Sequence, residues 1–137
     1  MSQRTDRLAA ALGESTARMQ SLLRKYLAQK GVSLSQARTL GTLEREGPRP
    51  LTELATLEQV SQPAMSYLVG RMELNGHVRR SSDAGDGRVV IVSITAAGRG
   101  VVKELLQRRA GLLADHLSNL PSSEIAALRR RCRPSAI

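Results

Sequence analysis

The stretch VSQPAMSYLVGRMELNG, residues 60–76, decides how this chain folds. Ser61 favours a helix N-cap, and Pro63 fits the first turn that follows it. Gly76 suits a left-handed residue just beyond the end of the helix. Apolar residues lie between these signals at the spacing i, i+3, i+4 and i+7, which predicts a buried helix face: Met65, Leu68, Val69 and Met72.

The opposite face of this helix carries hydrogen-bonding groups, one cation and a glycine: Gln62, Pro63, Ser66, Tyr67, Gly70 and Arg71. Side chains of this kind suit the major groove of DNA, which is wide enough to admit a helix. A solvated helix face is the alternative, and the face alone does not decide between the two.

Two further helices are predicted upstream of this one, and a third near the start of the chain. Thr52 is expected to cap a short helix that the turn at 59–61 connects to the helix described above. Ser35 is expected to cap a longer helix that ends at Gly47. An apolar stripe predicts another helix over 8–26. The inner residues of the short helix are predicted to be Leu54, Ala55 and Leu57.

The pattern changes period after residue 76. Residues 78–81 are predicted to form a short strand, and β-branched residues predict a second strand over 88–94; a loop of small and acidic residues at 82–87 joins the two. These segments form one hairpin. Two helices are predicted to follow, over 96–117 with Thr95 as its cap, and over 121–131.

Composition restricts the class of protein. The 137 residues include 21 Lys and Arg against 12 Asp and Glu, a net charge of +9 that favours a polyanionic partner such as nucleic acid. No apolar run approaches the roughly 20 residues that cross a bilayer, so no membrane association is expected. The lone Cys132 is interpreted as an incidental thiol, with a redox sensor as the alternative. A cytoplasmic protein is expected.

Four motifs follow one another along the chain: LTELA at 51–55, VSQPAMS at 60–66, DGR at 86–88 and TAAG at 95–98. In these motifs and their order, residues from about 34 to 98 resemble the MarR family of regulators. The resemblance implies a mainly α fold with a small β-hairpin wing. Residues 1–137 would form a single domain, with a winged helix-turn-helix core at 34–95 between dimerisation helices at 1–30 and 96–137.

The resemblance also implies a function. The chain would bind double-stranded DNA at a pseudo-palindromic operator as a homodimer, usually as a repressor that a small ligand or an oxidant releases. The alternative is a winged-helix module that binds proteins and does not read DNA. The residues expected to serve DNA binding are Thr52, Ser61, Gln62, Pro63, Ser66, Tyr67, Arg71, Arg80, Asp86 and Arg88.

The wing motif carries the most specific expectation. In the family the wing arginine enters the minor groove and a neighbouring aspartate steadies it; Arg88 and Asp86 match these positions. A narrow minor groove has a strong negative potential that suits an arginine on a thin hairpin. Asp83 and Asp86 would repel phosphate if unpaired, so pairing with Arg88 or Arg80 is expected.

Three departures from the family's pattern affect the expected site. The wing has small residues at 84–85 where many relatives carry arginines, and Tyr67 stands where relatives often have arginine. His77 replaces a large apolar residue and is predicted to be a packed or capping residue. Base preference and phosphate contacts are therefore expected to differ from those of relatives.

The terminal helices supply the expected dimer contacts. Their apolar residues are Leu8, Leu12, Met19, Leu22, Leu23, Leu113, Leu117, Ile125 and Leu128. No spacing of catalytic, metal-ligating or cofactor-binding residues is found, so neither an enzyme nor a metal or cofactor site is expected. The family resemblance implies a small-molecule effector as a further partner.

Overall fold

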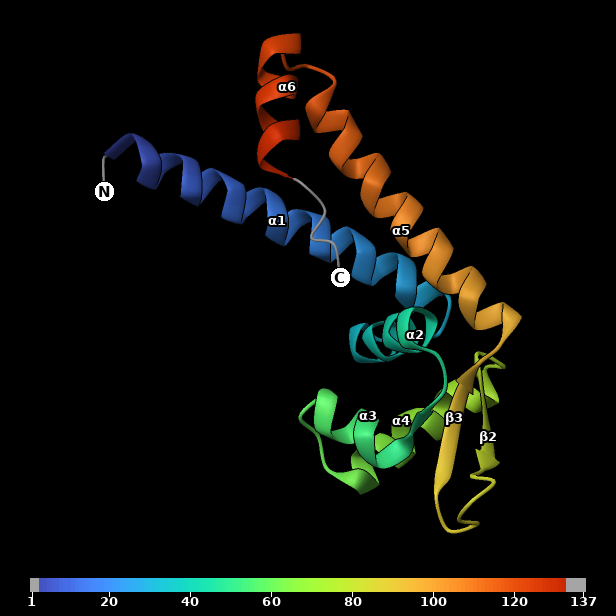
Figure 1. The fold of residues 1–137 in the computed structure, drawn as a ribbon. Coiled ribbons are helices and arrows are strands. Elements are labelled where there is room, and N and C mark those ends of the chain that lie inside the picture. Colours follow the sequence, from blue (N-terminus) through green and yellow to red (C-terminus); the bar gives the residue numbers. More distant parts are fainter. Residues whose placement is uncertain (1–2, 133–137) are drawn as a thin grey trace.

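The computed structural model describes residues 3–132 and is mainly helical with a small antiparallel sheet, as the sequence predicted (Figure 1). Residues 1–2 and 133–137, the outer ends of the predicted dimerisation segments, lie outside the described residues. The elements are α1 (Gln3–Gln29), α2 (Leu34–Glu46), β1 (Arg49–Pro50), α3 (Leu51–Leu57), α4 (Gln62–Leu74), β2 (Val78–Ser82), β3 (Val90–Ile94), α5 (Ala96–Leu117) and α6 (Ser122–Arg131).

Two helix starts follow the predicted capping chemistry. The Ser61 hydroxyl accepts a hydrogen bond from the Ala64 N–H at 3.2 Å, and Thr95 accepts one from the Gly98 N–H at 3.1 Å. Each cap satisfies a backbone donor that lacks a partner within its helix. Gly76 follows α4 with a φ of 77°, in the left-handed region. The ends of α4 and the start of α5 were therefore predicted correctly.

Two other predicted caps were wrong. Ser33, not Ser35, caps α2, because Gln36 completes a capping box: Ser33 Oγ accepts from the Gln36 N–H at 3.2 Å, and Gln36 Oε1 accepts from the Ser33 N–H at 2.9 Å. Thr52 lies inside α3, which begins after Pro50 without a side-chain cap. Leu57, predicted to be inner, is 51% exposed at the last position of that short helix.

The hairpin belongs to a three-stranded sheet in the order β1-β3-β2. The sequence did not indicate β1, because two residues that include a proline carry no strand pattern; Arg49 pairs with Val92. β3 begins at Val90 rather than at residue 88. The preceding residues form the turn, in which the Val89 N–H donates to the Asp86 carbonyl at 3.0 Å.

One hydrophobic core joins α2, α3, α4 and the sheet to the adjoining ends of α1 and α5. We call residues 34–94 the compact unit. The predicted inner face of α4 is buried, with Met65, Val69 and Met72 fully so and Leu68 partly. The other largest fully buried residues are Leu27, Leu40, Leu43, Leu54, Val92 and Thr39.

Helices α1, α5 and α6, which we call the helical arm, extend away from the compact unit (Figure 1). α1 and α5 meet beside α2 and then diverge, and α6 turns back beside the far end of α5. Where they meet, the Arg108 guanidinium lies 4.1 Å from the centre of the Tyr26 ring, and burial is the main cause that raises the pKa of Tyr26 to about 12. An ion pair between Arg99 and Glu44, 3.1 Å apart, ties α5 to α2.

Candidate nucleic-acid interface

The outward face of α4 is available for binding. Met65, Val69 and Met72 anchor the helix in the core, so the opposite side is held toward solvent. Tyr67 on that side is 69% exposed. Gln62, Pro63 and Arg71 are also exposed, and Ser66 and Gly70 are half-buried.

The hairpin and the start of α4 enclose a groove of about 450 Å³, which we call the wing groove. Its walls come from α3, α4 and both strands of the hairpin or their ends, which are distant in sequence. Six of the residues predicted to serve DNA binding meet there. The lining residues are Leu51, Thr52, Gln62, Pro63, Ser66, Arg80, Arg88, Val89 and Val90.

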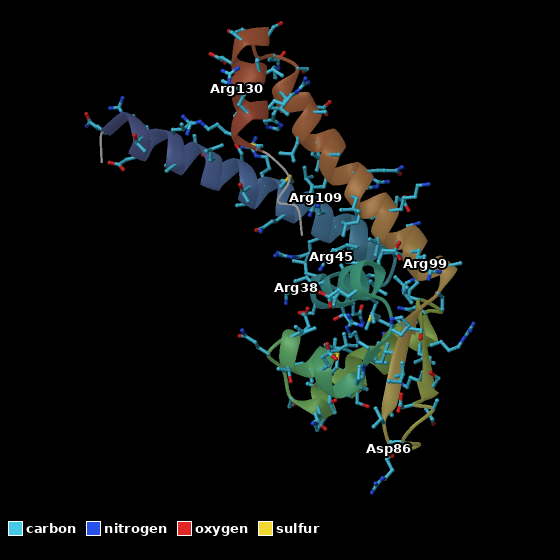
Figure 2. The ribbon with its side chains drawn as sticks, in the orientation of Figure 1. Arg38, Arg45, Asp86, Arg99, Arg109 and Arg130 are labelled. Atoms are coloured by element: carbon cyan, nitrogen blue, oxygen red, sulfur yellow. The ribbon has the colours of Figure 1, made fainter. Side chains whose placement is uncertain are left out.

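The wing loop presents one arginine to solvent. The Arg88 side chain is 94% exposed, and its Nε lies 3.4 Å from Asp86 Oδ1, which also accepts the Arg88 backbone N–H at 3.0 Å. Asp86 lies at the free end of the hairpin (Figure 2). The expected pairing of Asp86 with Arg88 is therefore present. This contact limits the directions in which the guanidinium points.

Asp83 has a different role from the one predicted. Its Oδ2 accepts hydrogen bonds from the N–H groups of Gly85 and Asp86, both at 3.1 Å. Aspartate commonly shapes turns in this way, by bonding the backbone two or three residues ahead. Asp83 thus folds the loop and pairs with neither Arg88 nor Arg80.

Arg80 differs from Arg88 although both line the groove. Its side chain is 32% exposed, and its Nη2 donates to the Ser66 carbonyl of α4 at 2.9 Å. Its Nε lies 3.8 Å from Glu73 Oε1. Sequence reasoning missed the contacts of Arg80 with Ser66 and Glu73, because no local pattern links a strand residue to the preceding helix.

Arg71 lies outside the wing groove. It lines a second groove of about 520 Å³, between α4, the end of α1 and the start of α2. Sequence reasoning also missed Arg24 there, which only the packing of α1 brings near Arg71. The lining residues are Arg24, Ala28, Gly31, Val32, Ser33, Leu34, Gln36 and Arg71.

The other charged runs lie away from the wing. Arg130 of α6 and Asp86 of the hairpin mark opposite ends of the molecule in Figure 2. Cys132 is exposed at the end of α6. Within residues 3–132, no helix is long and apolar enough to cross a membrane, and no three potential metal ligands gather.

His77 is packed where the compact unit meets the helical arm. It is 8% exposed, and its carbonyl accepts the Thr95 N–H at 3.0 Å. Its Nδ1 is buried without a hydrogen-bond partner among the described residues. Burial lowers the pKa of His77 below its usual value.

The predicted dimer residues differ in exposure. Leu23 is buried within the chain, whereas Met19 and Ile125 are half-buried. The remaining six are 41–61% exposed, which leaves an apolar face on each helix of the arm: Leu8, Leu12, Leu22, Leu113, Leu117 and Leu128.

Two helices joined by a tight turn, the second exposed beside a hairpin, define a winged helix-turn-helix protein. A model of the MarR family matches residues 30–89. A helix-turn-helix-type transcriptional regulator of Mycobacterium tuberculosis is 36% identical over 123 residues, covering 90% of this chain and 86% of the relative. The chain belongs to the MarR family and is a DNA-binding transcriptional regulator.

The chain is also similar to a more distant relative and to a solved structure. The transcriptional repressor MdtR of Bacillus subtilis is 26% identical over 108 residues, covering 79% of this chain and 70% of MdtR. The crystal structure of the YusO protein from Bacillus subtilis superposes with a TM-score of 0.83 at 23% identity, over 93% of this chain and 91% of YusO. The likeness to YusO shows a shared fold over nearly the whole chain.

Proposed function

We propose that the chain binds a pseudo-palindromic DNA site as a homodimer in the cytoplasm, with α4 in the major groove and Arg88 in the adjacent minor groove. The observation that carries this proposal is the wing groove, where Gln62 and Ser66 of α4 lie beside Arg88 of the hairpin. A helix held in the major groove would bring a neighbouring thin hairpin to the minor groove.

The dimer is supported by the apolar face of the helical arm. Leu8 and Leu12 are 61% and 59% exposed, far along α1 from the compact unit. Apolar faces of this extent on a soluble regulator favour association, and a second copy offers a matching face. Two copies related by a two-fold axis would place their α4 helices on half-sites about 34–36 Å apart.

The regulatory direction we propose is repression, on the example of MdtR, with release by a small ligand. The second groove, which Arg24 and Arg71 line, is the candidate effector site. A ligand with an anionic group there would engage Arg71 and withdraw it from DNA. An oxidant would instead reach the exposed Cys132.

A selection experiment tests the DNA-binding mode. The wild-type protein is used to select duplexes from a randomised pool, and the proposal predicts an inverted repeat. Gln62→Ala should then weaken binding to the selected duplex by roughly 1–3 kcal/mol while changing binding to random duplex much less. Selection of no shared sequence, or a salt-independent interaction with DNA, would contradict the proposal and favour a protein-interaction module.

A further inference from the structure

We propose that Arg80 is a positioning residue, which holds the recognition helix α4 at a fixed angle to the wing and does not bind phosphate. The proposal rests on the proposed DNA-binding mode and assigns a separate role to one arginine within it. Arg80 and Arg88 line the same groove, but their side chains are 32% and 94% exposed. The difference in exposure follows from what Arg80 contacts.

The first contact of Arg80 is the backbone of α4. Its Nη2 donates to the Ser66 carbonyl at 2.9 Å. A carbonyl oxygen has two lone pairs, so a helical carbonyl can accept a side-chain donor in addition to its bond within the helix. The guanidinium therefore holds the turn of α4 that contains Ser66.

The second contact is with Glu73, one helical turn beyond Gly70. Glu73 Oε2 accepts the Arg80 backbone N–H at 3.1 Å, and Glu73 Oε1 lies 3.8 Å from Arg80 Nε. β2 is an edge strand, so alternate N–H groups of its backbone point away from β3 and are free to bond the helix. Arg80 and Glu73 together join the main chain of the wing to the last turns of α4.

The third observation is the absence of a side chain at position 70. A Cβ on Gly70 would lie 3.0 Å from Arg80 Nη2, closer than a methyl group and a guanidinium nitrogen normally approach. Gly70 thus provides the space through which Arg80 reaches the Ser66 carbonyl. Helix propensity alone would favour alanine there, because glycine weakens a helix interior.

These contacts leave little of Arg80 for DNA. Its Nε is buried, and Glu73 opposes its charge. Both arginines lie beside a carboxylate, but Arg80 is also bonded to the Ser66 carbonyl and is only 32% exposed, whereas the 94% exposed Arg88 can approach phosphates and release counterions. Arg80 therefore sets where α4 lies relative to Arg88, so that both can reach adjacent grooves at once.

The test compares conservative variants on the duplex selected by the wild-type protein. Arg80→Lys keeps the charge but loses the planar fork that reaches Ser66 and Glu73 together. We expect Arg80→Lys and Arg80→Ala each to weaken binding by about tenfold, with an unchanged slope of log affinity against log salt. Arg79→Lys is the matched control, since Arg79 lies next to Arg80 on the opposite face of β2 and is exposed.

Gly70→Ala provides a second test, which leaves the Arg80 side chain itself unchanged. The added methyl should raise helix stability, measured by thermal unfolding, yet weaken DNA binding by displacing Arg80. In the Arg80→Ala background the same methyl should not weaken DNA binding further, because no guanidinium remains to displace. A methyl that clashed with DNA would instead weaken DNA binding equally in both backgrounds.

Three results would overturn the positioning role. They are wild-type affinity for Arg80→Lys, a salt slope reduced by about one per subunit in Arg80→Ala, and equal effects of Gly70→Ala in the two backgrounds. A wild-type protein that selects no duplex contradicts the proposed function itself. The two failures are therefore distinguishable.

Discussion

The compact unit and the helical arm use leucine in opposite ways. Leu40 and Leu54 of the compact unit are fully buried, whereas Leu8 and Leu12 of the arm are about 60% exposed. The helices have similar apolar spacing, so the pattern specifies a buried face without saying which chain buries it. The compact unit completes its core within one chain. The arm leaves an apolar face exposed, which we propose that a second copy of the chain covers.

Truncating one leucine from each region should separate these two uses, and this is the largest effect expected. Leu40→Ala should cost about 2–5 kcal/mol of unfolding free energy, because it leaves a cavity in the core. Leu12→Ala should leave the helical circular dichroism intact and weaken the dimer, measured by sedimentation equilibrium. Unchanged association of Leu12→Ala would show that this face of α1 does not form the dimer contact.

The junction between the two regions gives the next largest effect. A Cβ on Gly98 would lie 2.8 Å from Ile94 Cγ1 and would collide with the backbone carbonyl of His77, which cannot move aside. Gly98→Ala should destabilise the protein by about 1–3 kcal/mol in urea unfolding at a fixed protein concentration.

Gly100→Ala is the matched control for this junction. It lies on the same helix, and a Cβ there would meet no atom within 4 Å. It should stabilise the protein by about 0.5–1 kcal/mol, since alanine favours a helix. Equal effects of the two substitutions would show that the close approach of α5 to His77 does not constrain the fold.

The sequence predicted the elements of the compact unit better than it predicted their contacts. The bounds of α4 and α5 followed from local signals, since Ser61, Gly76 and Thr95 act on their own neighbours. The cap of α2 was misplaced because Ser33 and Ser35 are both plausible, and only the reciprocal bonds with Gln36 decide between them. A helix cap can be predicted from the sequence when one capping residue is present, and the prediction is ambiguous when two are.

Site residues were harder to assign than elements because their partners are distant in sequence. The exposed face of α4 and the Asp86–Arg88 contact could be predicted from spacing and from the family resemblance. The engagement of Arg80 by Ser66 could not, because it depends on how the hairpin packs against α4. The same holds for Arg71 and Arg24, which only the tertiary fold places on one groove.

Substitutions in the wing test whether Arg88 acts as a positioned side chain or only adds to a general positive potential. Their effect is expected to be smaller than that of the substitutions at the junction. Arg88→Ala should make the plot of log affinity against log salt shallower by roughly 1–2 units over two subunits, measured on the selected duplex. Asp86→Ala should also weaken binding, because Asp86 directs the Arg88 guanidinium. Simple electrostatics predicts the opposite sign, so tighter binding by Asp86→Ala would refute the positioned wing.

The smallest expected effect is a pH dependence of stability at the junction, carried by His77. Burial lowers its pKa in the folded protein, so the unfolded chain binds the proton more tightly. Its contribution to stability is therefore full above the unfolded value of about 6.5 and is lost as the pH falls toward the lower folded value. His77→Leu, which cannot be protonated, should remove that part of the decline.

Urea unfolding of both proteins between about pH 8 and pH 5 measures this difference. The two curves should run in parallel above the unfolded pKa, and below it the wild-type curve should fall relative to that of His77→Leu, since only the wild-type protein loses stability through His77. The comparison also bears on the junction, because the His77 carbonyl accepts the Thr95 N–H at the start of α5. Curves that stay parallel throughout would show that protonation of His77 is not linked to unfolding.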